Sequence, residues 1–447
     1  MSDFSAEFSR NLRASGVVGA GGAGFPAYVK AQGRAECALV NAAECEPLLK
    51  KDQKILEYFP GKVFDGLELM MKAVGAKRGL VGIKKKHEKV ILRLEEIAKS
   101  RKNISVLEMG DYYPAGDEQC LVYEATGRIV PPGGLPLDVG CVVSNVETLY
   151  NAAFAPRPVT ETFITVSGAV RKPATFRVPV GVTWREAVEL CGGATVKAPA
   201  YIDGGPMMGK VMTDFEAPVV KASGGIVVLP KDHPLIVKKA QSRPVFSRIG
   251  RSTCDQCSFC TEFCPRYMLG HNVQPHRVMR TMLFSSGPGH KLHSQYGLLC
   301  CECSLCTLYA CPEGLNPREA CVAAKADLRE LKTGFKNSSL NTGRAPRVHP
   351  VRDFRKVPVS KLVKRLGLEG YNKDAPWTEF SYKPPRVKIL MSQHIGVPCV
   401  PSVKEGQRVE KGAVVGDVAA EKLGCPAHAS ISGTVGRVNE KYVEITA

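Results

Sequence analysis

The sequence lacks long hydrophobic runs. No apolar stretch approaches the roughly 18 residues that a membrane-spanning helix needs, and the first residues, MSDFSAEFSRNLRASG, lack the apolar core and cleavage site of a secretory signal. We therefore expect no integral membrane segment and a soluble, cytoplasmic protein. Aromatic residues make up only 7% of the chain. Because no stripe of alternating aromatic and basic residues is present, we expect no nucleic acid partner.

Cysteine and positive charge, by contrast, are abundant. The 447 residues include 17 cysteines, and 61 Lys and Arg against 43 Asp and Glu give a net charge of +18. An odd, large cysteine count without a secretory signal favours metal or redox chemistry over disulfides. Much of the positive charge lies in residues 84–89 and 332–365, which we interpret as solvated faces or linkers.

The pattern of strands and helices predicts an α/β protein of five units. Residues 1–155 alternate glycine-rich turns, helices and short apolar strands, which indicates a Rossmann-like parallel sheet covered by helices. Residues 160–231 combine short strands with one helix, as in a β-grasp domain. A ferredoxin-like helical module follows at 245–331, then a basic linker at 332–386 and a β-sandwich of the barrel-sandwich hybrid type at 387–447. Within the first unit we expect strands at 37–42, 79–83 and 104–109 and helices at 62–73 and 88–99.

Two cysteine motifs, CxxCxxCxxxCP and CxxCxxCxxxxCP, carry the strongest signal. Three cysteines at this spacing surround one face of a 4Fe–4S cubane, and the fourth, before a proline, ligates the other cluster in two-cluster proteins. Zinc also accepts four thiolates, but its sites use two separated CxxC pairs. Cys301 is the spare cysteine, and a shift of one residue would exchange it with Cys300. We expect two 4Fe–4S clusters, one held by Cys254, Cys257, Cys260 and Cys311 and the other by Cys264, Cys300, Cys303 and Cys306.

Residues 16–30 read GVVGAGGAGFPAYVK, a glycine-rich turn that runs into a helix begun by Pro26. Such a turn offers bare backbone N–H groups and a helix N-terminus to a phosphate. Tight turns, however, need glycine for steric reasons alone. On this segment by itself a phosphate-binding loop and a purely structural turn both stay open.

The full string from Gly19 to Lys30 resembles the flavin and NADH loop in the family of the NADH-binding subunit of respiratory complex I and the C subunit of Rnf-type complexes. Three further segments match this family in order: 41–47 (NAAECEP), 113–118 (YPAGDE) and 144–149 (SNVETL). The resemblance extends through the β-grasp unit, which is similar to soluble-ligand-binding domains, and the cluster module. It implies noncovalent FMN in the first unit, with NADH stacked over it as electron donor.

The resemblance also implies which residues contact the cofactors. A lysine offers a cation to phosphate, and asparagine side chains offer paired donor and acceptor groups to an isoalloxazine edge. No catalytic acid or base is expected, because the cofactors carry the redox chemistry. The implied residues are Gly19, Gly21, Gly22 and Lys30 for flavin phosphate or nicotinamide nucleotide, Asn41, Glu44, Asn145 and Thr148 for the flavin, and Gly116 and Glu118 for the nicotinamide nucleotide.

Domain order narrows the resemblance. Rnf C subunits carry their small β-sandwich at the N-terminus, whereas the similar segment here, 394–418, follows the clusters. That order is similar to the cobalamin reductases of propanediol-utilisation microcompartments. It implies NADH-dependent reduction of cob(III)alamin to cob(II)alamin and on to cob(I)alamin for cobalamin recycling in a bacterial microcompartment, with cobalamin as acceptor and an adenosyltransferase and shell proteins as candidate partners. The alternative is a peripheral NADH-oxidising or electron-relay subunit of an Rnf-like ferredoxin:NAD complex.

Overall fold

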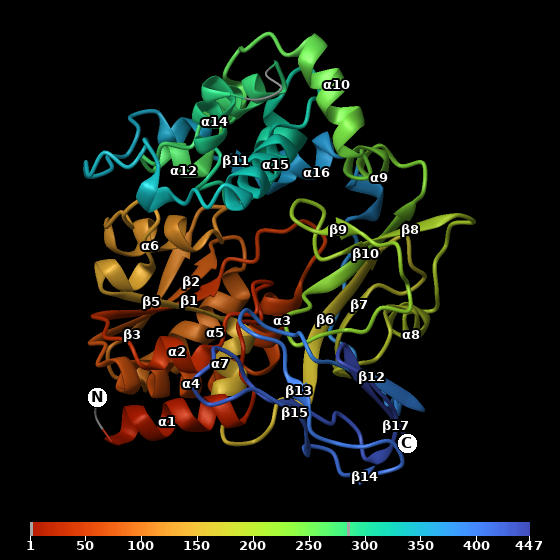
Figure 1. The fold of residues 1–447 in the computed structure, drawn as a ribbon. Helices are drawn as coiled ribbons and strands as arrows, with labels where there is room; N and C mark the ends of the chain where they lie inside the picture. Colours follow the sequence, from red (N-terminus) through yellow and green to blue (C-terminus); the bar gives the residue numbers. More distant parts are fainter. Residues whose placement is uncertain (1–2, 284–286) are drawn as a thin grey trace.

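The computed structural model describes residues 3–283 and 287–447, so residues 1–2 of the expected first unit and 284–286 of the expected cluster module lie outside it. Figure 1 shows an N-terminal α/β unit, a β-rich unit beside it, a helical unit across one end of both, and a small C-terminal β unit at the opposite end. The protein is a mixed α/β protein, as the sequence predicts. In the described part of the chain, no helix is long and apolar enough to cross a membrane.

A four-stranded parallel sheet of order β3–β2–β1–β5 forms the centre of the N-terminal unit. The elements are α1 (Asp3–Ala14), α2 (Ala27–Ala31), β1 (Cys37–Ala42), α3 (Lys51–Tyr58), α4 (Pro60–Val74), β2 (Arg78–Lys84), α5 (Glu88–Lys99), β3 (Ile104–Met109), β4 (Tyr112–Tyr113), α6 (Glu118–Thr126), a 3-10 turn (Pro136–Val139), β5 (Cys141–Asn145) and α7 (Val146–Ala152). Alternate side chains of β1 enter different cores: Ala38 and Val40 pack with α1, α2, α4 and α5, and Leu39 packs with α6. Helices therefore cover both faces of the sheet. The predicted strands and helices of this unit are confirmed, whereas α3 was not predicted.

The second unit is a five-stranded sheet of order β7–β6–β10–β8–β9 that carries one helix. Its elements are β6 (Glu161–Gly168), β7 (Ala174–Pro179), α8 (Trp184–Leu190), β8 (Pro199–Asp203), β9 (Lys210–Val211) and β10 (Gly225–Pro230). Strands β6 and β10 are parallel, and the other pairs are antiparallel. Thr183 and Glu186 form a capping box that starts α8. The cap directs Trp184 into the core, where it is 1% exposed.

Short helices form the third unit, and many of them begin at a proline. Its elements are α9 (Pro234–Lys239), α10 (Arg243–Thr253), α11 (Phe259–Glu262), α12 (Pro265–Met268), α13 (Pro275–Met279), a 3-10 turn (Arg280–Leu283), α14 (Pro288–Gln295), a π-turn (Cys306–Ala310) and α15 (Pro317–Glu330). Proline lacks an N–H and has a fixed φ, so it suits the first turn of a helix. A small core that includes Val278, Met279, Cys321 and Ala324 joins α13 to α15.

The segment expected to be a solvated basic linker contains ordered structure. Strand β11 (Val357–Pro358) pairs antiparallel with β4 of the first unit, and helix α16 (Val359–Arg365) follows it directly. Leu362 and Val363 of α16 are buried. Arg352 forms an ion pair with Glu124 at 2.7 Å. The linker interpretation is therefore wrong for this part, because apolar residues spaced along the basic run give α16 a buried face.

Two small antiparallel sheets, β12–β18–β17–β14 and β13–β15–β16, form the C-terminal unit. The strands are β12 (Arg386–Leu390), β13 (Val400–Pro401), β14 (Arg408–Val409), β15 (Val414–Asp417), β16 (Ala427–His428), β17 (Gly433–Val438) and β18 (Tyr442–Thr446). Their shared core includes Ile389, Val415 and Ile445. Arg13 of α1 donates to the carbonyl of Val418 at 2.9 Å, which attaches this unit to the first one.

Candidate functional site

Two asparagines lie side by side at the C-terminal edge of the parallel sheet. Strands β1 and β5 are neighbours, and their register pairs Asn41 with Asn145. Ligands of open α/β sheets bind at this edge. Asn41 Nδ2 donates to the carbonyl of Gly116 (2.7 Å), and Asn145 Nδ2 donates to Asp52 Oδ2 (2.7 Å). The structure thus brings together three of the residues that the sequence predicts to contact flavin and nicotinamide nucleotide.

The glycine loop reaches the same edge. Thr148, in the first turn of α7, accepts a hydrogen bond from Ala20 N at 3.0 Å. A Cβ added to Gly21 would lie 3.5 Å from the Cβ of Asn145. Gly22 has a φ of +102°, and apart from its own residue and its two chain neighbours no described atom lies within 4 Å of its Cβ position. The loop therefore presents open backbone at Gly22, where a phosphate can approach closely.

Two other predicted ligand contacts already have partners inside the protein. Gly19 N donates to Phe25 O at 2.8 Å, so this N–H shapes the loop. Lys30 Nζ donates to the carbonyl of Val143 in β5 at 2.7 Å. Burial lowers the pKa of Lys30, and the charge of Glu118 opposes that decrease. Glu118 therefore lies near enough to act on the charge of Lys30, and the cofactor contacts predicted for the two residues stay predictions.

A buried ion pair beneath the loop was not predicted. Lys51 Nζ lies 2.9 Å from Glu147 Oε2 and donates to Ala20 O at 2.6 Å. Both charged side chains are at most 2% exposed. Glu147 Oε1 also accepts from Thr162 Oγ1 (2.8 Å) and Phe163 N (3.1 Å) in β6. The pair therefore holds the glycine loop, α7 and the second unit together. Glu147 lies within the recognised segment 144–149, but no local signal marks Lys51.

Asp52 and Glu44 form an acidic pair beside the asparagines. Burial raises the pKa of Asp52 to about 8, and the charge of Glu44 adds to this increase. Burial also raises the pKa of Glu44. Among the described residues, Asp52 Oδ1 is buried without a hydrogen-bond partner. A protonated carboxyl with an unpartnered oxygen, next to two asparagines, fits a ligand such as flavin that has donors and acceptors along one edge.

Tyr113 connects this edge directly to the helical unit. It lies three residues before Gly116, is 1% exposed, and its hydroxyl donates to the carbonyl of Cys303 at 2.7 Å. Asp117, which caps α6, forms an ion pair with Arg266 at 2.7 Å. The predicted nucleotide segment 113–118 therefore also contacts the helical unit, in part through the second cysteine motif.

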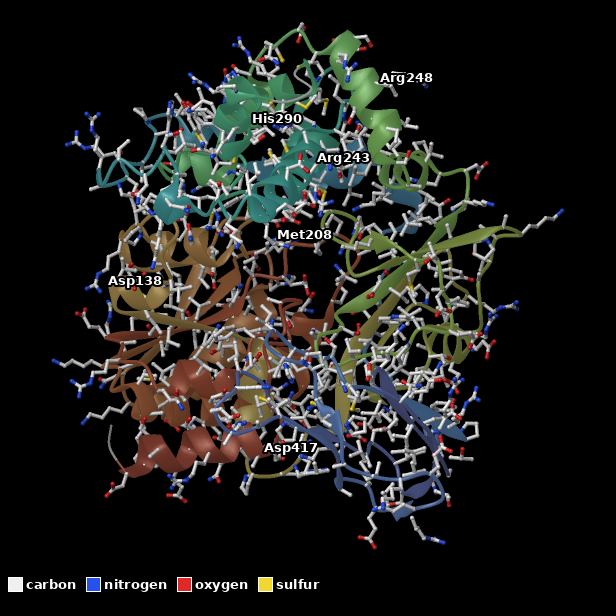
Figure 2. All side chains as sticks on the ribbon, in the orientation of Figure 1. Asp138, Met208, Arg243, Arg248, His290 and Asp417 are labelled. Carbon is white, nitrogen blue, oxygen red and sulfur yellow. The ribbon has the colours of Figure 1, made fainter. Side chains whose placement is uncertain are left out.

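Glu46 joins the same edge to the second unit. Its carboxylate accepts from the N–H groups of Met207 (2.8 Å) and Met208 (2.7 Å). Figure 2 shows Met208 where the three units meet. The amide of Met208 does not require a specific side chain, so nothing in the sequence marks this contact. Three units thus converge on residues 41–47.

The lysine run at 84–89 is not a uniformly solvated face. Lys84 is 1% exposed and lies 3.2 Å from Asp111, which also pairs with Lys86 at 3.0 Å. The solvated-face interpretation is wrong for Lys84, because β2 extends to this residue and carries it into the sheet edge.

The two cysteine motifs fold into the same turn twice. Residues 254–260 read CDQCSFC and residues 300–306 read CCECSLC. Gln256 and Ser258 have φ values of +61° and +67°, and Glu302 and Ser304 have φ values of +60° and +65°. The repeated conformation aligns Cys300, and not Cys301, with Cys254.

A π-turn absorbs the extra residue of the second motif. Cys311 N donates to Cys306 O at 3.2 Å, which closes the wider π-type turn. Cys264 and Cys311 then have nearly the same φ and ψ before their prolines, −71° and 118° against −73° and 118°. The two cysteines therefore occupy equivalent positions despite the unequal gap.

The structure brings the predicted ligands together in two groups. The first set, Cys254, Cys257, Cys260 and Cys311, lines one cavity. We call the group of Cys264, Cys300, Cys303 and Cys306 the second set. Burial raises the pKa of Cys264 and of Cys306. Nearby Cys301 and, to a smaller extent, Cys300 add to the increase at Cys264, and Cys300 adds to the increase at Cys306. No three His, Cys, Asp or Glu side chains of the described residues are placed to hold a single metal ion.

Local contacts also distinguish Cys300 from Cys301. Glu302 N donates to Cys300 Sγ at 3.4 Å. A hydrogen bond from Cys321 and the nearby charge of Lys325 lower the pKa of Cys300 to about 7, which favours a thiolate. Cys301 instead lies beside Cys303 and raises its pKa.

Family models match the chain along most of its length. The Nuo51 FMN-binding domain matches residues 12–153, the SLBB domain 163–211, the 4Fe-4S dicluster domain 253–316 and the RnfC barrel sandwich hybrid domain 372–447. The chain therefore combines an FMN-binding domain with a 4Fe-4S dicluster domain, and its barrel-sandwich hybrid domain follows the dicluster domain.

Named relatives agree with this order. Cobalamin reductase PduS of Citrobacter freundii is 40% identical over 97% of this chain and 95% of that protein. Cobalamin reductase PduS of Salmonella typhimurium is 40% identical over 98% of this chain and 96% of that protein. The C subunit of the proton-translocating ferredoxin:NAD(+) oxidoreductase complex of Clostridium ljungdahlii is 33% identical, but over 58% of this chain and 55% of that protein. The match over nearly the whole length shows that the chain belongs to the PduS cobalamin reductase family.

Proposed function

We propose that this oxidoreductase takes electrons from NADH and passes them through FMN and two 4Fe–4S clusters to the cobalt of a corrinoid. One observation carries the proposal: the hydroxyl of Tyr113 in the predicted nucleotide segment binds the carbonyl of Cys303, a predicted cluster ligand, at 2.7 Å. The name of the relatives supports cobalamin as the acceptor. Bound flavin supplies the conversion between two-electron transfer from a hydride donor and one-electron transfer.

Different residues at the sheet edge would bind different parts of the cofactors. Gly21 and Gly22 leave room for a phosphate, and Asn41 and Asn145 present amide groups to the ring system. Asp52 keeps a proton at neutral pH and can donate it in a hydrogen bond. Thr148 and Glu44, which are also predicted to contact the flavin, would complete the flavin site. Gly116 and Glu118 would hold the nicotinamide nucleotide, and Lys30 would hold either the flavin phosphate or the nicotinamide nucleotide.

The contacts also suggest the order in which electrons would pass through the two sets of cysteines. Cys303 of the second set packs in one core with Tyr113 and Cys45 beside the flavin edge. Among the described cysteines, Cys257 of the first set alone is exposed. We therefore place the second set next to the flavin and the first set at the exit to the acceptor.

Valine at position 22 should strongly reduce FMN content. Gly22 has a φ of +102° and faces open space, so a β-branched side chain would be strained and would occupy the space of the ligand. We expect at least about a tenfold loss of FMN affinity, equivalent to about 1.4 kcal/mol. Fluorescence of released flavin after purification measures this loss. Gly61→Val is the matched control, because Gly61 also has open space but lies in α4, and its FMN content should stay normal.

Phenylalanine at position 113 should slow electron transfer from flavin to the clusters. The substitution keeps the ring but leaves the carbonyl of Cys303 without its donor. We expect a several-fold slower cluster reduction in stopped-flow experiments with NADH, with flavin reduction unchanged. Tyr112→Phe is the control, because Tyr112 donates to Glu124 and not to a cysteine motif. Equal effects of the two variants would argue against this link.

The proposed function also implies macromolecular partners and a cellular location. From the family resemblance of this chain we propose that an adenosyltransferase and microcompartment shell proteins are its partners. We also propose that the protein is cytoplasmic and is housed in a bacterial microcompartment. Identity to relatives named cobalamin reductase supports the link to cobalamin on which this setting depends.

An anaerobic titration with NADH tests the proposal. In protein loaded with FMN, iron and sulfide, we expect the flavin band and the iron–sulfur absorbance to bleach together. Bleaching of the flavin band alone would show that electrons from NADH do not reach the clusters. If neither band bleached, NADH would be rejected as the electron donor.

A further inference from the structure

The two cysteine turns share a backbone but differ at one equivalent side chain. Gln256 and Glu302 each lie two residues after the first cysteine of their motif, with φ values of +61° and +60°. Their side chains therefore start from the same place relative to the sulfur atoms. One is a neutral amide, and the other is a carboxylic acid of almost the same shape.

Gln256 is a hydrogen-bond donor to its cluster site. Its Nε2 lies 3.2 Å from Cys254 Sγ, and its Oε1 accepts from Arg280 Nε at 3.0 Å. Because Arg280 can only donate, it fixes which end of the amide faces the sulfur. The orientation of Gln256 is thus set by a residue that does not itself touch the cysteines.

Glu302 makes no such contact with sulfur through its side chain. Its carboxylate pairs with Lys325 at 2.9 Å and with Arg318 at 3.3 Å. Arg318 also pairs with Glu319 at 3.4 Å, so two carboxylates face two cations. The second set therefore has a balanced charge group at the position where the first set has an N–H donor.

Reduction of a 4Fe–4S cluster adds one negative charge. Hydrogen bonds to the sulfur atoms and nearby cations stabilise the reduced form and raise the reduction potential. Asp255 and Glu313 line the cavity of the first set and oppose this effect, but they would be unchanged in a substitution of Gln256.

We propose that Gln256, held in place by Arg280, is a positioning residue that gives the first-set cluster a higher reduction potential than the second-set cluster. The proposal rests on the function proposed above, in which the first set is the exit. The cysteines of the two sets would then hold clusters between which one electron would pass from the second set to the first, so that the second-set cluster would become oxidised and the first-set cluster reduced, with no bond made or broken. The higher potential would hold electrons at the exposed end, near Cys257.

Exchange of the two side chains tests the proposal. Gln256→Glu keeps the shape but replaces the donor with a charge, and Glu302→Gln makes the opposite change in the second set. Potentiometric titration followed by EPR, with dithionite and mediators, measures both clusters without NADH or corrinoid. We expect Gln256→Glu to lower the reduction potential of one cluster by about 59 mV. This shift is a tenfold decrease in the ratio of reduced to oxidised cluster at a given potential. The reduction potential of the other cluster should not change in Gln256→Glu, and Glu302→Gln should raise the potential of that other cluster.

Arg280→Gln provides a second variant that alters no ligand. It should lower the same couple as Gln256→Glu, by a smaller amount, because Arg280 is exposed to solvent. Iron analysis confirms that both clusters are present, and a Gln256→Glu protein that lost a cluster would leave Arg280→Gln to decide. Unchanged potentials, equal shifts of both couples, or an unchanged protein in which the couple lowered by Gln256→Glu is the lower of the two, would overturn the proposal. Because NADH is absent, this result is independent of whether NADH is the donor.

Discussion

Replacement of Cys300 with alanine should remove one of the two clusters, whereas Cys301→Ala should leave both in place. The repeated turn aligns Cys300 with Cys254, and Cys300 Sγ accepts from the N–H of Glu302. A cluster that loses one of four thiolate ligands is lost or becomes labile, because its cysteines hold it in the protein. Iron and acid-labile sulfide per chain should fall by about half in Cys300→Ala.

Cys301→Ala is the matched control, since the two cysteines are adjacent and both are half-buried. Its iron content and EPR spectrum should match those of the unchanged protein. If Cys301→Ala lost a cluster and Cys300→Ala kept both, the register inferred from the repeated turn would be wrong.

Methionine at position 51 should destabilise the protein by about 3–5 kcal/mol, the usual cost of leaving one partner of a buried ion pair alone. Glu147 would keep its bonds from Thr162 and Phe163 but lose the cation 2.9 Å away. Chemical denaturation, followed by circular dichroism, measures the change. The loop contact through Ala20 would also be lost, so FMN content should fall with stability.

Lys62→Met serves as the control for this effect. Lys62 pairs with Asp65 at 3.1 Å, but its side chain is 49% exposed. Exposed pairs contribute about 0–1 kcal/mol, so this variant should unfold close to the unchanged protein. Similar losses in the two variants would show that the Lys51–Glu147 pair has no special role.

Local sequence patterns predicted much of the framework. The apolar run CALVNA is a strand at 37–42, where alternate residues enter two cores. The cysteine motifs also predicted that Cys254, Cys257, Cys260 and Cys311 lie together, and these four residues line one cavity. The glycine loop and the asparagines met at one sheet edge, since parallel strands end together there.

Long-range contacts were not predictable in this way. Tyr113 binds a carbonyl 190 residues away, and a carbonyl carries no side-chain signal in the sequence. Lys51 lies in an ordinary polar helix start, and its burial depends on how the second unit packs over α3 and α7. Lys84 looked solvated because its neighbours are lysines, yet it lies inside the sheet edge. In each case tertiary packing determined the environment of the residue.

Reoxidation by cob(III)alamin, after anaerobic reduction with NADH, tests the central claim most directly. The account predicts that the bleached flavin and iron–sulfur bands recover while the absorbance of cob(II)alamin appears, with one equivalent formed for each electron delivered. Reduced protein that stays bleached in the presence of cob(III)alamin would contradict the claim that this flavin and iron–sulfur chain reduces corrinoid cobalt.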